Sequence, residues 1–161
     1  MTDDDAEDIF EYASNPEVSR FVGWEAHKTI QDSRDFLNKV LGKYANYEVA
    51  EWAVVYKQEN KVIGTCGYLH WGFEQARAEI GYVLGREYWN QGLTTEAVRE
   101  VIRFGFAAMQ LNRIQAICEV DNIASGRVLE KAGMQLEGIL RQYIQYKDKP
   151  LDMKMYSVIR P

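Results

Sequence analysis

The residues that most clearly suggest chemistry surround a glycine at the start of a helix. Residues Ala78–Val98 read AEIGYVLGREYWNQGLTTEAV, so an apolar strand leads into a polar turn around Gly92 and then into a helix. The first N–H groups of a helix lack partners within it, and the helix dipole adds positive charge there. This pattern favours a pyrophosphate held by main-chain groups, although a plain connection is the alternative. The sequence carries neither the GxGxxG of dinucleotide-binding turns nor the GKS or GKT of a P-loop.

A second motif follows in Arg113–Met134, which read RIQAICEVDNIASGRVLEKAGM. The pattern predicts a strand, then Asn122 and Ser125 in an N-x-x-S spacing, then an amphipathic helix that ends at Gly133. Asparagine suits the end of the strand and the cap of the helix. Helix capping alone is therefore the ordinary alternative to ligand contact for both polar residues.

Together the two motifs resemble the GNAT superfamily of N-acetyltransferases, most closely its branch of ribosomal-protein N-terminal acetyltransferases. In that branch the phosphate turn reads W-x-x-G-x-x-T-E-A, as Trp89–Ala97 does here. The second motif reads N-x-x-S-x-x-V-L-E-K-x-G, as Asn122–Gly133 does. The likeness extends over nearly the whole chain, including the early stretch Asn15–Gly23.

The resemblance implies that acetyl-CoA is the cosubstrate, and because the sequence has no metal-ligand spacing we expect no metal. Main-chain groups of the turn would bind the pyrophosphate. The pantetheine arm would fill a gap where the strand Glu79–Leu84 splays from the strand Ile114–Val120, pairing with the exposed strand as another strand would. Ordinary core packing is the alternative role for the side chains of that strand. The residues implied in cofactor binding are Tyr82, Val83, Leu84, Gln91, Gly92, Leu93, Thr94, Thr95, Asn122 and Ser125.

Two residues are candidates for catalysis. Glu79 is implied as the base that takes a proton from the attacking ammonium, directly or through water, because only a neutral amine attacks a thioester. Its alternative is a solvated charge at the strand edge or a partner of Arg77. Ser125 is implied as the acid that protonates the departing CoA thiolate. Many superfamily members have a tyrosine acid at the position of Leu129, and its replacement here favours Ser125.

Further titratable residues are secondary candidates. His70 and Glu74 are candidates for a water relay if Glu79 is not the base, and His27, in the stretch WEAHKT, is a candidate for lining the acceptor side. A lone histidine is more often structural than catalytic. None of these residues belongs to a motif that names the acceptor.

The composition places limits on the function. The chain has 161 residues, 47% of them hydrophobic, and a net charge of −5, which indicates one globular domain over residues 1–161. The absence of a basic stripe argues against a nucleic-acid partner. No apolar run approaches the roughly 20 residues of a membrane span, and the N-terminus is acidic, so we expect a cytoplasmic protein. Cys66 and Cys118 are expected to be reduced core thiols. We expect a monomer or a homodimer.

The elements needed to position these residues follow from hydrophobic periodicity, which predicts the order ααβββαβαββ. The resemblance implies a layered α+β fold with a mixed, mostly antiparallel sheet flanked by helices. The short first strand usual in the superfamily is missing. The predicted elements are helices Asp3–Ser14, Thr29–Tyr44, Leu93–Met109 and Ile123–Ala132, and strands Trp52–Lys57, Lys61–His70, Glu79–Leu84, Ile114–Val120, Gln135–Tyr146 and Leu151–Ile159, the last two joined by a turn around Asp148.

These observations predict an acetyl-CoA-dependent N-acetyltransferase in which an amine attacks the thioester directly in a ternary complex. The expected acceptor is the α-amine of a protein or peptide. Two alternatives stay open: an acetyltransferase acting on a small-molecule amine, and a non-catalytic acyl-CoA-binding module, which the leucine at position 129 motivates.

Overall fold

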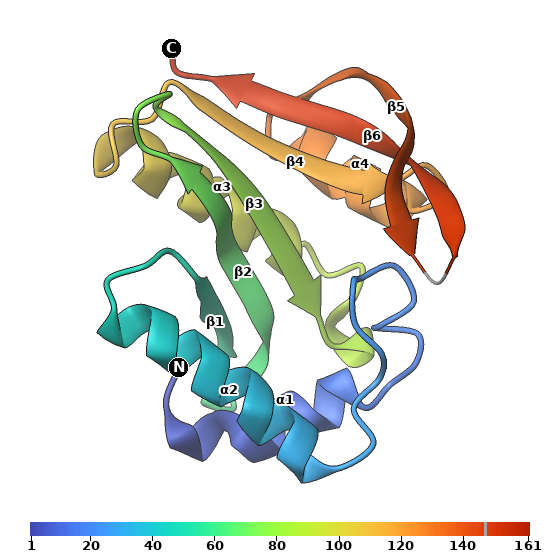
Figure 1. The fold of residues 1–161 in the computed structure, drawn as a ribbon. Coiled ribbons are helices and arrows are strands. Elements are labelled where there is room, and N and C mark those ends of the chain that lie inside the picture. The colour runs from blue at the N-terminus through green and yellow to red at the C-terminus, as the bar shows by residue number, and fades with distance from the viewer. Residues whose placement is uncertain (147) are drawn as a thin grey trace.

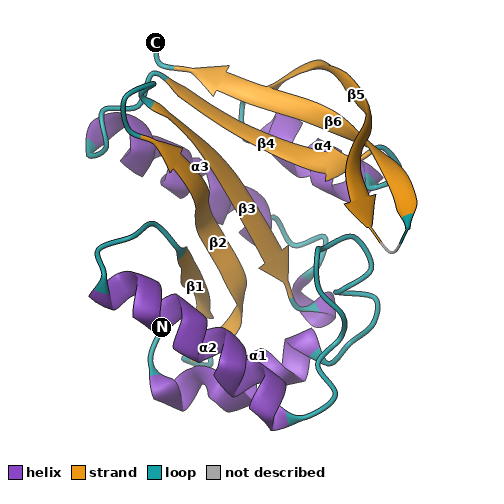
Figure 2. Cartoon of the chain, in the orientation of Figure 1, coloured by secondary structure: helices purple, strands orange, loops and turns teal. Residues whose placement is uncertain are grey.

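The computed structural model describes residues 1–146 and 148–161. Six strands form one sheet in the order β1-β2-β3-β4-β6-β5, flanked by four α-helices (Figures 1 and 2). The elements are the 3₁₀ turns Asp3–Asp5 and Arg86–Tyr88, the helices α1 (Ala6–Ala13), α2 (Ile30–Ala45), α3 (Leu93–Ala107) and α4 (Ile123–Lys131), and the strands β1 (Glu51–Tyr56), β2 (Lys61–Gly72), β3 (Arg77–Leu84), β4 (Arg113–Glu119), β5 (Gln135–Tyr146) and β6 (Lys149–Ile159).

The helices form two layers, one on each face of the sheet (Figure 1). One apolar cluster joins α1 and α2 to the sheet and includes Ile9, Leu37 and Val62. A larger cluster joins α3 and α4 to the other face, around the fully buried Tyr68, whose hydroxyl donates to the carbonyl of Val101 over 2.7 Å. Among the described helices, none is both long enough and apolar enough to cross a bilayer.

The predicted order of helices and strands is confirmed, with differences at the element ends. The predicted first helix is divided into a 3₁₀ turn and α1, because the Asp5 carboxylate accepts the N–H of Thr2 over 2.7 Å and forms a local capping box. Strands β2 and β3 extend two residues further toward their hairpin than predicted. Within the predicted turn around Asp148, Lys147 lies outside the described residues.

Backbone conformation at the helix ends agrees with the sequence pattern. Helix α2 begins at a capping box in which the Asp32 carboxylate accepts the N–H of Thr29 over 2.8 Å. Backbone N–H donors from Thr29 and Lys28 lower the pKa of Asp32. Helix α4 ends before Gly133, as predicted, and Gly133 has φ +94°, the left-handed conformation in which glycine often terminates a helix. In the described residues no strand precedes α1, and β1 lies at the edge of the sheet.

The sheet divides in its middle, between β3 and β4. These two strands are parallel and pair at only three positions, ending with Glu79 opposite Gln115. Beyond that point residues 80–84 continue beside β2 alone, and residues 116–119 continue beside β6 alone. Figure 1 shows the two strands starting side by side and then diverging. The predicted splay is therefore confirmed, and we call the space between residues 80–84 and 116–119 the sheet opening.

Candidate functional site

The predicted phosphate turn has an open approach to its main chain. Gly92 is the N-cap of α3 at φ +83°, and its carbonyl accepts the N–H of Glu96 over 3.0 Å. No side chain of the described residues caps this helix. The N–H groups of its first turn are therefore unpaired donors that could bind an anion. A Cβ placed at Gly92 would meet no heavy atom within 4 Å. This open space over free amide donors fits a pyrophosphate.

Trp89 anchors the turn to the end of β3. Its indole N–H donates to the carbonyl of Leu84 over 2.7 Å, and the guanidinium of Arg86 lies 4.8 Å from the ring centroid. The side-chain amide of Gln91 donates back to the carbonyl of Glu87 over 2.9 Å. The tryptophan thus fixes the turn in place, and the Leu84 carbonyl has a protein partner already.

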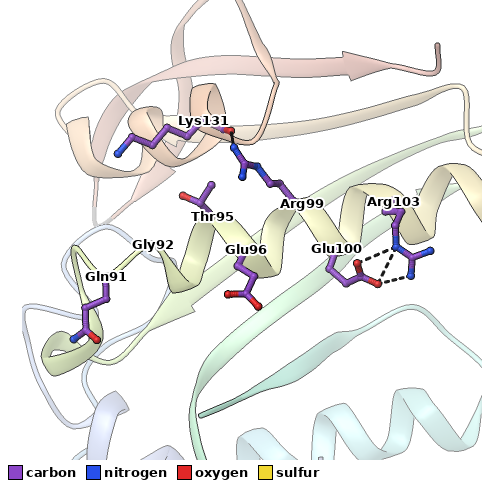
Figure 3. A pocket seen from close by; sticks show the side chains of 8 residues that line it. All are labelled: Gln91, Gly92, Thr95, Glu96, Arg99, Glu100, Arg103 and Lys131. Carbon is purple, nitrogen blue, oxygen red and sulfur yellow. Dashed lines mark hydrogen bonds and ion pairs between the residues drawn. The ribbon is translucent and has the colours of Figure 1, made fainter. Parts of the chain in front are cut away.

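A cavity of about 780 Å³ runs from the turn along α3 to the end of α4 (Figure 3). Three residues predicted to bind the cofactor line it, namely Gln91, Gly92 and Thr95, whereas Leu93 and Thr94 do not. Thr95 is 9% exposed. The full lining comprises Gln91, Gly92, Thr95, Glu96, Arg99, Glu100, Arg103 and Lys131.

Charged residues in this cavity were missed by the sequence reasoning. A guanidinium N–H of Arg99 donates to the carbonyl of Lys131 over 2.5 Å and so ties α3 to the end of α4. Arg103 forms an ion pair with Glu100, one turn earlier on the same helix, with Nε 2.9 Å from Oε2. This pair raises the pKa of Arg103 and lowers that of Glu100. Only the packing of α3 beside α4 brings the Arg99 guanidinium to the main chain of Lys131, and spacing in the sequence does not reveal this contact.

A hydrogen-bonded cluster connects β3 to the start of α4 beside the sheet opening. The Tyr82 hydroxyl lies 2.7 Å from Oγ of Ser125 and donates to the Ser125 carbonyl over 3.1 Å. The Ser125 N–H donates to Oδ1 of Asn122, the N-cap of α4, over 3.1 Å. Burial raises the pKa of Tyr82, so its hydroxyl keeps its proton. The structure thus brings three predicted residues together, and the helix-capping role of Asn122 is present.

Glu79 lies on the other face of the sheet from this cluster. Side chains alternate along β3, where Val83 packs with the α1 and α2 cluster and Tyr82 with the α3 and α4 cluster. Glu79 shares the face of Val83, and its Oε2 accepts from the side-chain amide of Gln115 over 3.1 Å. Glu79 and Ser125 therefore approach the sheet opening from opposite faces.

Gln115 is itself held in place by an ion pair. Nε of Arg113 donates to the side-chain carbonyl of Gln115 over 3.2 Å, and its other nitrogens bind both carboxylate oxygens of Glu137 over 2.6 and 2.7 Å. Arg113, together with the hydroxyl of Ser157, lowers the pKa of Glu137 to about 2. A continuous chain of contacts thus runs from the last strand pair of the sheet to Glu79.

The secondary candidates occupy different surroundings. His70 is the cross-strand neighbour of Glu79, and Glu74 is exposed in the β2–β3 connection. His27 is engaged in the α1–α2 loop, where Nδ1 lies 2.8 Å from the Ser33 hydroxyl and the ring packs against Trp24. Burial lowers the pKa of His27. Its contacts are those of a structural histidine that holds the loop against α2.

The residue at the tyrosine position and the two cysteines belong to the core. Leu129 is fully buried in the α3 and α4 cluster, so no hydroxyl is supplied from there. Cys66 and Cys118 are free and buried, as predicted. Burial raises the pKa of Cys66 to about 12 and also raises that of Cys118. These thiols are accordingly poor nucleophiles. No three His, Cys, Asp or Glu residues within residues 1–146 and 148–161 are grouped to hold a metal ion.

Comparison with known proteins finds the same motifs and fold elsewhere. The acetyltransferase (GNAT) domain family matches residues 1–135. YoaA of Bacillus subtilis, an uncharacterized N-acetyltransferase, is 37% identical over 161 residues, which span 100% of this chain and 91% of YoaA. A GNAT-family acetyltransferase from Bacillus anthracis superposes with a TM-score of 0.88 at 31% identity, covering 99% of this chain and 91% of the other. A ribosomal-protein-S5-alanine acetyltransferase from Vibrio fischeri superposes with a TM-score of 0.84 at 26% identity, covering 100% and 93%.

Proposed function

This chain belongs to the GNAT acetyltransferase family, and we propose that within it the enzyme acetylates the α-amino group of a protein or peptide N-terminus. Membership makes the protein an acetyl-CoA-dependent N-acetyltransferase. The acceptor class and the residue roles are our proposal. The observation that carries it is the sheet opening, with the uncapped start of α3 at Gly92 on one side of it and the carboxylate of Glu79 on the opposite face of the sheet.

The residues around the turn and the sheet opening fit the donor. The first-turn N–H groups of α3 and the open space over Gly92 would hold the pyrophosphate. Residues 80–84 of β3 have no strand partner on the β4 side, so their main chain would pair with the pantetheine arm. Acetyl-CoA supplies an acetyl thioester when bound. Holding that thioester at a fixed place beside an incoming amine contributes several kcal/mol to the rate acceleration.

Glu79 is proposed to accept the proton of the acceptor ammonium. The amide of Gln115 binds Oε2, which leaves Oε1 to receive that proton. The amine nitrogen then forms a bond to the thioester carbonyl carbon while the bond from that carbon to sulfur breaks. His70, the cross-strand neighbour of Glu79, is suited to a relay through water if the acceptor lies further away.

Ser125 is proposed to protonate the departing thiolate. Its hydroxyl lies 2.7 Å from that of Tyr82, which holds it beside the sheet opening. The amine nitrogen loses a second proton when it becomes an amide, and that proton replaces the one that serine gives up. A thiol has a pKa near 8.5, and the thiolate therefore needs only modest help in leaving. In this proposal Ser125, held by Tyr82, protonates the thiolate in place of a tyrosine at position 129.

Two observations support an α-amine as the acceptor. An α-amino group, with a pKa near 8, is roughly 10% neutral at pH 7, whereas a lysine side chain is under about 0.1% neutral. A site with a single half-buried carboxylate therefore suits the α-amine better. The similar Vibrio fischeri protein is named for acetylating alanine on a ribosomal protein, which favours a polypeptide acceptor here too.

The test is a thiol-release assay with acetyl-CoA and three acceptor sets. The first set is peptides with free N-termini, the second is the same peptides with blocked N-termini and one lysine, and the third is small amines. We expect release with the first set alone, and mass spectrometry should place the added acetyl group on the α-nitrogen. Release with small amines alone would refute the acceptor class. Binding of acetyl-CoA without release from any set would indicate a non-catalytic module.

A further inference from the structure

We propose that Arg99 and Lys131 form a second phosphate site, which binds the phosphomonoester on the 3′ position of the adenosine ribose of acetyl-CoA. Both residues line the cavity that begins at Gly92. The proposal rests on the proposed function, because it assigns part of the cavity to the nucleotide end of the donor. It adds two cofactor-recognition residues from outside the phosphate turn.

The position of the two cations relative to the turn fits one nucleotide. Arg99 lies seven residues after Gly92, which corresponds to about 10 Å along α3. The pyrophosphate and the 3′-phosphate hang from the same ribose, so the second anion must be bound close to the first. Lys131 comes from the last turn of α4, on the far side of the same cavity. A ligand anchored at Gly92 and extending along α3 therefore passes between the two helices.

Both cations have capacity left for an anion. Arg99 uses one guanidinium N–H to bind the Lys131 carbonyl, and a guanidinium has five donors in all. Within the described residues the Lys131 ammonium makes no ion pair, and both side chains are exposed. The carbonyl contact by itself would be an ordinary C-terminal cap for α4. The remaining donors of this exposed guanidinium have no protein partner among the described residues and are available to an anion.

The other charges of the cavity are arranged so that they do not oppose this role. Figure 3 shows the Arg99 side chain projecting from α3 toward Lys131 on α4, whereas the carboxylates of Glu96 and Glu100 project from the other side of α3. Glu100 is neutralised by Arg103. The side of the cavity toward α4 is therefore positive in a chain whose net charge is −5.

The experiment compares the affinities of acetyl-CoA and its 3′-dephospho form by calorimetry on the full chain. We expect the wild-type protein to bind acetyl-CoA about tenfold more tightly, the size of one charge-assisted contact at a partly exposed site. Lys131→Gln and Arg99→Gln should each reduce this ratio toward one by weakening acetyl-CoA binding alone. Arg127→Gln is the matched control, because it removes the same charge from an exposed residue of α4 that does not line the cavity, and it should keep the ratio.

Several outcomes would overturn the proposal, and they differ from one another. Equal wild-type affinities for both ligands would refute the second phosphate site while leaving the proposed function intact. A ratio that survives in Lys131→Gln and Arg99→Gln would refute the assignment to these residues. Equal loss of affinity for both ligands in Arg99→Gln would show that Arg99 only caps α4. No binding of either ligand would refute the proposed function as well. A wild-type ratio that falls toward one as salt is raised supports an ionic contact.

Discussion

Gly92→Val should separate the binding of acetyl-CoA from the stability of the fold. The backbone at Gly92 has φ +83°, a conformation that costs a residue with a side chain about 1–2 kcal/mol. A Cβ at this position has no protein atom within 4 Å, so the substitution starts into open space. The fold therefore loses only this strain, which lowers the Tm by roughly 2–8 °C for a chain of this size.

The effect on acetyl-CoA binding should be much larger. The valine side chain would occupy the space through which the pyrophosphate approaches the first-turn N–H groups of α3. Loss of two charge-assisted hydrogen bonds, at about 1.5 kcal/mol each, amounts to about 3 kcal/mol. That free energy corresponds to an affinity roughly 100-fold weaker.

A second glycine provides the matched control. Gly133 has φ +94°, and a Cβ there also meets nothing within 4 Å, but Gly133 does not line the cavity. Gly133→Val should therefore lower the Tm by a similar amount and leave the affinity for acetyl-CoA within about twofold, since its strain is of the same size. The assays are thermal unfolding and calorimetric titration of both folded variants. Unchanged affinity in Gly92→Val, or an equal loss in both variants, would refute the assignment of the turn to phosphate.

Three further changes test the other parts of the site. Glu79→Gln should lower kcat about 100-fold or more at low pH, where the acceptor amine is protonated, and leave acetyl-CoA affinity unchanged; overlapping pH–rate profiles would make Glu79 a bystander. Ser125→Ala and Tyr82→Phe should each lower kcat. Because the two hydroxyls form one hydrogen-bonded pair, the double variant should be no slower than the slower single variant. Losses in kcat that add up in the double variant would contradict this. Glu137→Gln should make the free energy of unfolding depend less on pH below about 4.5. The lowered pKa of Glu137 contributes stability that is fully present above the ordinary glutamate pKa and is lost as the pH falls toward 2. Unfolding curves of both proteins between pH 6 and pH 2 check this, and the same pH dependence in both would refute it.

The fold was predictable because the chain marks its elements clearly. Apolar periodicity, the Asn122 cap and Gly133 defined α4 and its neighbours, and the resemblance supplied the splay. The first helix was predicted as one piece, since a local hydrogen bond between Asp5 and Thr2 leaves no trace in apolar spacing. The ends of β2 and β3 were underestimated because a polar residue such as Arg77 can extend a strand through its main chain, which here pairs with both β2 and β4.

The parts of the candidate site that consist of main chain in one short segment could be predicted from the sequence. The contacts between side chains that are far apart in the sequence could not. The turn at Gly92 follows from a local sequence pattern. The contact between Tyr82 and Ser125 joins residues 43 positions apart, and Arg99 meets Lys131 across 32 positions. Such pairs depend on how helices are placed on the sheet, which a single sequence does not specify. The same holds for Gln115, whose amide orients the carboxylate of Glu79.

The hydrogen bond between Trp89 and Leu84 means that the length of β3 sets the distance between the turn at Gly92 and Glu79. Because the indole fixes the turn to the last residue of the strand, the distance from that turn to Glu79 is set by five residue steps, roughly 16 Å in an extended chain. Removing two residues from this stretch would shorten the reach by about 7 Å and keep the carboxylate on its face. Removing one would turn the carboxylate to the wrong face altogether. If the turn binds the donor and Glu79 faces the acceptor, as proposed, the number of residues in this strand sets the length of the donor arm that fits and the face of the sheet from which the acceptor arrives.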